Sequence, residues 1–329
     1  MCLRVLRLPK DKNKTFELSP DFSVSSLPRV IRIEVSGLCN LRCIHCPTGV
    51  QKGDKGGIMS WDVFDRIVDE IKKYMGVDVV VLYHGGESFL NKNIFKMISF
   101  FKEMEIPRIQ TNTNGCIITD DMLEKIVNSG LTRIEFSIDG LSPEENNEIR
   151  RGCDYHKVAS TIKKLLRLRR KEKYSALKDI HIVNVQIPSE EQVRSTEEVA
   201  IPKYLLDDFS EFKEEITFKS SYMIKWPAFD CSDQYKIIQF PISPRSEPLN
   251  YCDHVTELIT FRWNGDVVPC CYDIAGQYVI GNIMEHSLEE IWNNKRYKAL
   301  RESIHLGKFI PLCANCNNIQ PLGYVVKRR

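Results

Sequence analysis

Short runs of apolar, often β-branched residues alternate with longer amphipathic segments along the first two thirds of the chain. The runs have strand length, as in VIRIEVS at 30–36, and the longer segments carry apolar residues at helical spacing. The pattern predicts strands at 30–36, 77–83, 107–111, 132–138, 180–187 and 216–220. It predicts helices at 60–74, 91–104, 119–129, 157–173 and 196–211, the last interrupted by Pro202. Strands that alternate with helices indicate a parallel sheet.

The number of βα units limits the architecture of this sheet. Six units are too few to close an eight-stranded barrel, so an open partial barrel and a doubly wound sheet remain. After residue 221 the pattern changes, because 223–252 is rich in proline and Asn264-Gly265 predicts a hairpin turn ahead of a helix at 288–303. We therefore expect an N-terminal extension at 1–29, a core domain at 30–221 and a smaller domain at 222–329.

Charge and hydropathy exclude several classes of protein. The 46 Lys and Arg residues nearly balance the 44 Asp and Glu residues, which gives no overall basic surface for nucleic acid. The basic run Lys163–Lys171 is interpreted as a solvated helix face. No apolar run approaches the roughly 18 residues of a membrane span. The N-terminus lacks the apolar segment of a signal peptide, so we expect a cytoplasmic protein.

Twelve cysteines in a chain without a secretion signal favour metal or redox chemistry over a disulfide scaffold. Cys39, Cys43 and Cys46 form a C-x3-C-x2-C triad directly after the first predicted strand. Three thiolates on one loop do not complete a tetrahedral zinc site, but they suit an iron–sulfur cluster that leaves one iron open. A structural zinc loop that borrows a distant fourth ligand is the alternative.

The triad at the end of the first strand of a parallel βα fold resembles the radical S-adenosylmethionine (SAM) enzymes. Gly85-Gly86-Glu87, Thr113-Asn114-Gly115 and Ser137–Asp139 end the next three strands and match segments of that family in order, with Arg150 following. The ring between the second and third cysteines is usually Tyr or Phe in the family, whereas this chain has His45.

The resemblance implies a fold, a cofactor and a set of binding residues. The expected fold class is α/β, a partial (βα)6 parallel barrel with a small C-terminal cluster-binding domain made of a β-hairpin and a helix. The expected first cofactor is a [4Fe-4S] cluster whose open iron binds SAM, which is then cleaved to a 5′-deoxyadenosyl radical. The expected SAM-binding residues are His45, Gly85, Gly86, Glu87, Asn114, Ser137, Asp139 and Arg150.

A second group of cysteines lies in the C-terminal third of the chain: Cys252, Cys270, Cys313 and Cys316. Four thiolates can close a metal site fully, and the spacing also fits a zinc ribbon. Read with the first triad, the pattern resembles the twitch domain, a shortened SPASM domain, and implies one auxiliary [4Fe-4S] cluster with four cysteine ligands. The choice of Cys270 over its neighbour follows the count of residues after Gly265. The remaining cysteines are Cys2, Cys116, Cys153, Cys231 and Cys271.

The architecture is similar to that of 2-deoxy-scyllo-inosamine dehydrogenase, which oxidises a cyclic alcohol. The similarity implies hydrogen-atom abstraction and two-electron oxidation of a small, sugar-like substrate, with the auxiliary cluster as electron acceptor and a flavodoxin- or ferredoxin-type electron donor. The alternatives are maturation of a ribosomal peptide by epimerisation or crosslinking, and a non-enzymatic iron–sulfur or zinc scaffold. No catalytic residue is identified from the sequence, and the candidates are the thiols of Cys231 and Cys153 and the imidazole of His84.

Overall fold

A nine-stranded sheet forms the centre of the computed structural model. The structure describes residues 18–50, 56–74, 76–194, 198–224, 226–227, 235–241, 250–314, 316, 318–319 and 322–328. The strand order is β10-β9-β8-β1-β2-β3-β4-β5-β6. The parallel strands that overlap the six predicted ones are β1 (Val30–Ile33), β2 (Val79–Val81), β3 (Arg108–Thr113), β4 (Arg133–Asp139), β5 (Asp179–Gln186) and β6 (Ile216–Tyr222). The predicted α/β fold, a partial parallel barrel, is confirmed.

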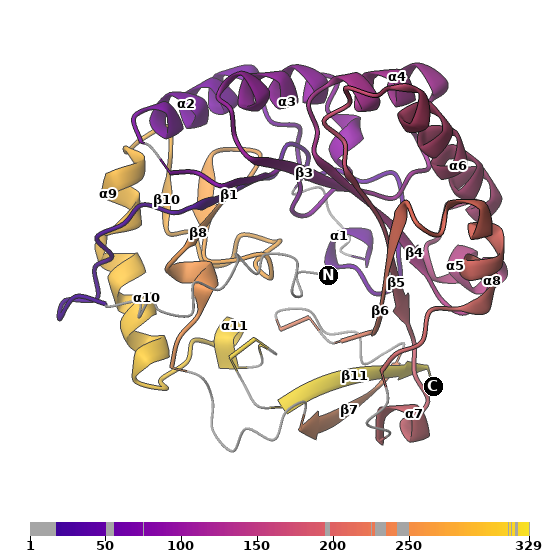
Figure 1. Cartoon of the computed structure of the whole chain (residues 1–329). Helices are drawn as coiled ribbons and strands as arrows, with labels where there is room; N and C mark the ends of the chain where they lie inside the picture. Colours follow the sequence, from indigo (N-terminus) through magenta and orange to yellow (C-terminus); the bar gives the residue numbers. More distant parts are fainter. Residues whose placement is uncertain are drawn as a thin grey trace.

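Helices cover one face of this sheet and form an outer arc around it in Figure 1. They are α2 (Trp61–Lys72), α3 (Ile94–Glu103), α4 (Asp120–Asn128) and α6 (Tyr155–Lys171). Ser60 and Thr119 begin α2 and α4, because each side-chain oxygen accepts a hydrogen bond from a backbone N–H in the first turn. The cationic face of α6 pairs with acidic side chains, as Arg170 does with Glu211 and Glu215.

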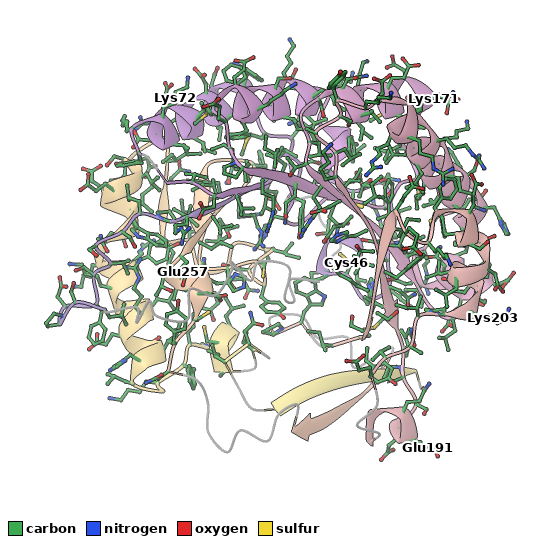
Figure 2. The ribbon with its side chains drawn as sticks, viewed as in Figure 1. Cys46, Lys72, Lys171, Glu191, Lys203 and Glu257 are labelled. Atoms are coloured by element: carbon green, nitrogen blue, oxygen red, sulfur yellow. The ribbon has the colours of Figure 1, made fainter. Side chains whose placement is uncertain are left out.

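The opposite face of the sheet encloses the barrel interior and carries polar side chains together with a small apolar cluster of Val30, Val79, Val81 and Leu258. Ile31 and Ile33 of β1 belong to the apolar core beneath the helices, whereas Arg32 and Glu34 alternate with them and are 1% exposed. Figure 2 shows Cys46 inside the arc and Lys72 and Lys171 on its outer rim. The alternation therefore separates an apolar layer under the helices from a polar interior that faces the strand ends.

The structure corrects two expectations in the core domain. The helix predicted over 196–211 is wrong: α7 (Glu190–Arg194) precedes it, and a short α8 (Lys203–Asp208) begins after Pro202 and is followed by the 3-10 turn η2 (Ser210–Phe212). Proline fixes its own backbone and cannot donate within a helix, so it starts α8 instead of interrupting a longer helix. An unpredicted helix α5 (Pro143–Ile149) follows β4 and is capped by Ser142.

The C-terminal part extends the same sheet. The predicted hairpin forms from β8 (Leu258–Phe261) and β9 (Asp266–Val268), with β10 (Gly281–Asn282) alongside. β8 pairs in parallel with β1, so the hairpin is continuous with the core. The boundary at residue 222 stays a prediction.

Three further features of the chain differ from the sequence-based expectation or were not predicted. The helix expected at 288–303 is two helices, α9 (Leu288–Trp292) and α10 (Lys295–His305), because Asn294 caps α10 anew. Short segments complete the described elements: α1 (Pro47–Val50), α11 (Pro311–Ala314), η1 (Ser88–Leu90) and η3 (Asp253–Val255). A separate antiparallel pair, β7 (Tyr235–Pro241) and β11 (Leu322–Arg328), includes part of the proline-rich region. Among the described residues, no helix has both the length and the apolar character of a membrane span.

Candidate functional site

A cavity lies at the carboxyl ends of β2 to β6, where α/β folds place their active sites. It brings together the cysteine triad and every residue that the resemblance implied for SAM. These lining residues are Cys39, Cys43, His45, Cys46, Gly85, Gly86, Glu87, Asn114, Ser137, Asp139 and Arg150. Of the three catalytic candidates, His84 lines the cavity and Cys153 does not. Cys231 lies outside the described residues.

Gly85 and Gly86 let the loop after β2 pack tightly against the loop that carries the triad. A Cβ atom on Gly86 would lie 2.3 Å from the Leu38 carbonyl oxygen, and one on Gly85 would lie 2.5 Å from Glu34 Oε1. The Glu87 N–H donates to the same Leu38 oxygen at 2.8 Å. The two glycines are therefore needed for contact between the loops, in addition to any approach of a ligand.

Glu87 is buried and joins the loop after β2 to the end of β3. Its carboxylate accepts hydrogen bonds from the Thr113 hydroxyl at 2.9 Å, the Asn114 N–H at 2.8 Å and the Phe89 N–H at 3.2 Å. Burial raises the pKa of Glu87, and these donors oppose the rise by stabilising the carboxylate. The side chain therefore supports the fold of the site, and we propose that it also binds SAM.

Asp139, at the end of β4, holds two of the proposed SAM-binding residues. Its Oδ2 atom accepts a hydrogen bond from Arg150 Nη1 at 2.8 Å and lies 3.0 Å from His45 Nε2. Burial lowers the pKa of His45 to about 4, so the ring is neutral near pH 7 and donates from Nε2 to the carboxylate. His45 Nδ1 and Arg150 Nε are buried without a partner. Such atoms on a cavity wall are suited to a polar ligand such as SAM.

The triad thiols fit a group that brings positive charge to the loop. Burial raises the pKa of Cys43 to about 12 and also raises that of Cys39. Coordination to iron would reverse this effect, because a metal-bound thiol is deprotonated. The Leu41 N–H already points at Cys39 Sγ, at 3.5 Å, and N–H donors of this kind stabilise cluster sulfurs.

The second cysteine group gathers where β9, η3 and α11 meet. Burial raises the pKa of Cys252, Cys270, Cys313 and Cys316, and each of the four interacts electrostatically with at least one of the others. Cys271 is disulfide-bonded, and Cys270 stays the proposed ligand of the adjacent pair. In the described part of the chain, no group of three or more His, Cys, Asp or Glu side chains is arranged to hold a single metal ion. The fit rests on donor chemistry, since groups of three or four thiols can ligate an iron–sulfur cluster.

His84 occupies the cavity wall next to the glycine pair. Its Nε2 atom lies 3.4 Å from the Asp273 carbonyl oxygen, and its Nδ1 atom is buried without a partner. A carbonyl oxygen can only accept, so Nε2 carries the hydrogen and Nδ1 keeps a lone pair. Burial lowers the pKa of His84 to about 3, which keeps the ring neutral.

Sequence reasoning missed the residues that cover the open side of the cavity. Tyr222 is the last residue of β6, and Tyr272 and Ile274 lie in the loop after β9. The ring of Tyr272 packs edge-to-face on Trp226, with centroids 5.3 Å apart. No local pattern marks these side chains, because they meet only when the C-terminal loop folds over the strand ends. The sequence offers one indication of Tyr272, which directly follows the pair Cys270-Cys271.

Comparisons with known proteins agree with this geometry. The model of the radical SAM superfamily matches residues 33–184. The model of the SPASM iron–sulfur cluster-binding domain matches residues 252–317. The two matched segments contain the triad and the four-cysteine group respectively.

Curated relatives and solved structures are similar at low identity. The chain is 24% identical over 330 residues to a tungsten-containing aldehyde ferredoxin oxidoreductase cofactor-modifying protein of Pyrococcus furiosus, covering 88% of this chain and 87% of that one. It is 31% identical over 138 residues to a GTP 3′,8-cyclase of Clostridium botulinum, covering 41% and 43%. BtrN in complex with AdoMet and 2-DOIA has a TM-score of 0.55 at 19% identity, covering 89% and 94%. The structure of anSMEcpe with AdoMet and Cp18Cys peptide has a TM-score of 0.56 at 15% identity, covering 87% and 88%.

The two family matches fall on the two cysteine groups, and the solved structures share the fold across most of the chain. The resemblance drawn from the sequence is therefore confirmed, including the expected cofactors, SAM and iron–sulfur clusters. The chain therefore carries a radical SAM domain at 33–184 and a SPASM domain at 252–317.

Proposed function

We propose that the chain is an oxidoreductase that removes two electrons from a small, polyhydroxylated substrate. The observation that carries this proposal is His84, which lines the cavity at the proposed SAM site and whose Nδ1 atom is buried without a partner. The second cysteine group of the same chain is the proposed site of an electron acceptor. Side chains with hydroxyl and amide groups line the same cavity, among them Asn112, Ser221 and Tyr222. Groups of this kind orient a substrate that carries several hydroxyls.

The chain's own cysteines would hold the cofactors. The proposed ligands are Cys39, Cys43 and Cys46 for the SAM-binding cluster, and Cys252, Cys270, Cys313 and Cys316 for the auxiliary cluster. When bound, these groups and SAM supply hydrogen-atom abstraction from carbon and an acceptor for one further electron. A flavodoxin- or ferredoxin-type protein is the proposed source of reducing electrons.

His84 takes the proton that completes the oxidation. A secondary alcohol becomes a ketone when it loses one hydrogen atom from carbon, one proton from oxygen and one electron. Nδ1 can accept that proton because the Asp273 carbonyl fixes the hydrogen on Nε2. Burial lowers the pKa of His84 to about 3, so the free ring is neutral, and it would pass the proton on instead of keeping it.

Isotope content of the product tests the reaction type. The cluster-loaded protein is incubated with SAM, a reductant and a panel of cyclic polyols and aminocyclitols in deuterated water. The proposal predicts a product two hydrogens lighter than its substrate, with no deuterium fixed on carbon. A product of unchanged composition that carries one solvent deuterium on carbon would contradict the oxidation.

Peptide maturation is the second candidate, favoured by the fold shared with anSMEcpe, whose structure contains the Cp18Cys peptide. Given polyols alone, a peptide epimerase would cleave SAM and leave the polyols unchanged. Given its peptide, it would return a hydrogen atom from a thiol and fix one solvent deuterium on carbon. A non-enzymatic scaffold would leave SAM intact. The products of the same incubation therefore separate the three functions.

A further inference from the structure

Cys116 and Cys153 form a close pair of thiols outside the cavity and outside both cysteine groups assigned to clusters. Their Sγ atoms are 3.2 Å apart, inside the normal contact distance of two unbonded sulfurs. Both are free and half-buried, on turns that lie 37 residues apart in the chain. A disulfide needs about 2.05 Å between the sulfurs, so about 1 Å of movement would join them.

The two cysteines are not equivalent. The Cys116 thiol donates its hydrogen to Cys153 Sγ, and the Asn146 side-chain amide also points at Cys153 Sγ, at 3.7 Å. The hydrogen bond from Cys116 lowers the pKa of Cys153, and the nearby Arg150 charge lowers it further. Cys153 is therefore the better thiolate and nucleophile of the pair.

Each cysteine is hydrogen-bonded through its backbone N–H to a residue that lines the cavity. The Cys116 N–H donates to Asn114 Oδ1 at 2.9 Å, and the Cys153 N–H donates to the Arg150 carbonyl oxygen at 2.8 Å. Asn114 and Arg150 both line the cavity. Next to Arg150, the Arg151 carbonyl accepts the N–H of Arg42 on the cluster loop, at 2.9 Å. A bond between the sulfurs would thus link two turns that both brace the triad loop.

We propose that Cys116 and Cys153 are a reversible redox modification site that forms an intramolecular disulfide by exchange with a low-molecular-weight disulfide. The Cys153 thiolate attacks one sulfur of the oxidant and releases its first thiol. The Cys116 thiol then displaces the second thiol and loses its proton to solvent. One disulfide is consumed, one is formed, and two small thiols are released, so atoms and electrons balance.

The pair differs from the cluster cysteines in what it can do. Iron would occupy the seven assigned ligands of the loaded protein, whereas these two thiols stay available. An intracellular disulfide is typically transient and regulatory, which fits a pair that is half-exposed and already in contact. Oxidation would brace the turns that carry Asn114 and Arg150 without using any residue that binds iron or SAM.

Glutathione disulfide is the probe for this site. The cluster-loaded full chain is incubated with it without oxygen, remaining thiols are alkylated, and peptides are mapped by mass spectrometry. We expect a crosslink between the peptides of Cys116 and Cys153 that is about 2 Da lighter than their sum and is removed by dithiothreitol. The crosslinked form should unfold at a temperature roughly 5 °C higher, because the bond closes a loop.

Two single variants test the order of attack. Cys116→Ser should accumulate glutathione on Cys153, because the resolving thiol is gone. Cys153→Ser should take up at least tenfold less glutathione on Cys116 in the same time. Absence of the wild-type crosslink would overturn the proposal, as would equal glutathione uptake by the two variants. The wild-type measurement stands by itself if either variant folds poorly.

Discussion

The Glu34 carboxylate and the Gly85 backbone join the first two strand ends of the site. Glu34 Oε1 accepts the Gly85 N–H at 3.0 Å, and a Cβ atom at position 85 would lie 2.5 Å from that same oxygen. Glu34 Oε2 accepts the N–H of Trp263 at 3.3 Å, from the turn after β8. One buried side chain thus ties the radical SAM core to the C-terminal segment, close to the cluster loop.

Substituting Gly85 tests how much of the glycine motif is structural. Gly85→Ala forces the new methyl group against Glu34, and overpacking of this kind costs about 1–3 kcal/mol. We expect that loss in urea unfolding of the apoprotein, before any SAM is added. Gly281→Ala is the matched control, because its Cβ would lie 3.2 Å from the Ile291 side chain, which can move. Equal stability of the two variants would contradict a tight contact at Gly85.

Glu34 also makes the stability of the fold depend on pH. Burial raises its pKa from 4.5 to about 7, so the folded protein holds this proton more tightly than the unfolded chain does. The stabilising contribution is fully present below the unfolded pKa and is lost as pH rises through about 7. A shift of this size corresponds to roughly 3 kcal/mol.

The variant Glu34→Gln isolates this contribution. The amide of the variant does not titrate. The unfolding free energy of the wild type minus that of the variant should therefore fall as pH rises from about 5 to about 8. Denaturant unfolding of both apoproteins across that range measures the difference. A difference that stays constant with pH would show that Glu34 titrates normally.

Removing Glu87 should affect folding as well as SAM. Glu87→Ala leaves the Thr113, Asn114 and Phe89 donors without their acceptor. Each buried donor that loses its partner costs about 1–3 kcal/mol of stability. We expect a lower unfolding midpoint in the apoprotein and weaker SAM binding in the loaded protein. Glu103→Ala, at an exposed helix end, is the control and should change neither. Loss of SAM binding with unchanged apoprotein stability would show that Glu87 serves the ligand alone.

The pair of Asp139 and Arg150 should behave as a buried ion pair. Asp139→Ala leaves the Arg150 guanidinium, 8% exposed, without its carboxylate, at a cost of about 3–5 kcal/mol. Asp179→Ala breaks the ion pair with Arg133 at the other end of β4, but Asp179 is 44% exposed and the cost should stay below about 1 kcal/mol. Thermal unfolding of the two apoproteins compares them directly. Similar losses would contradict the distinction drawn from burial.

The strand ends were predictable from the sequence, whereas their mutual contacts were not. Alternation of apolar and polar residues located β1 to β6, and the segments at their ends matched a family pattern. The same alternation did not predict that Glu34 is buried, because a polar residue on a strand normally faces water. Here it is buried in the interior of the partial barrel, which exists only after the strands curve around it.

Long-range pairing explains the other gaps. The Asn264-Gly265 turn predicted a hairpin, but nothing local indicated that β8 would pair with β1, whose residues precede it by more than 200 positions. The approach of Cys116 to Cys153 likewise depends on β3 and β4 being neighbours. Helix α5 did carry a signal, since Ser142 caps a helix that has Pro143 at its start.

Iron content and SAM cleavage of two multiple-cysteine variants test the cluster assignment most directly. One variant replaces Cys39, Cys43 and Cys46 by Ala, and the other replaces Cys252, Cys270, Cys313 and Cys316. After anaerobic reconstitution we expect about eight irons in the wild type and about four in each variant. Reductive SAM cleavage should persist only where the triad is intact. A triad variant that keeps about eight irons or still cleaves SAM, or a wild type that binds only zinc, would contradict the assignment.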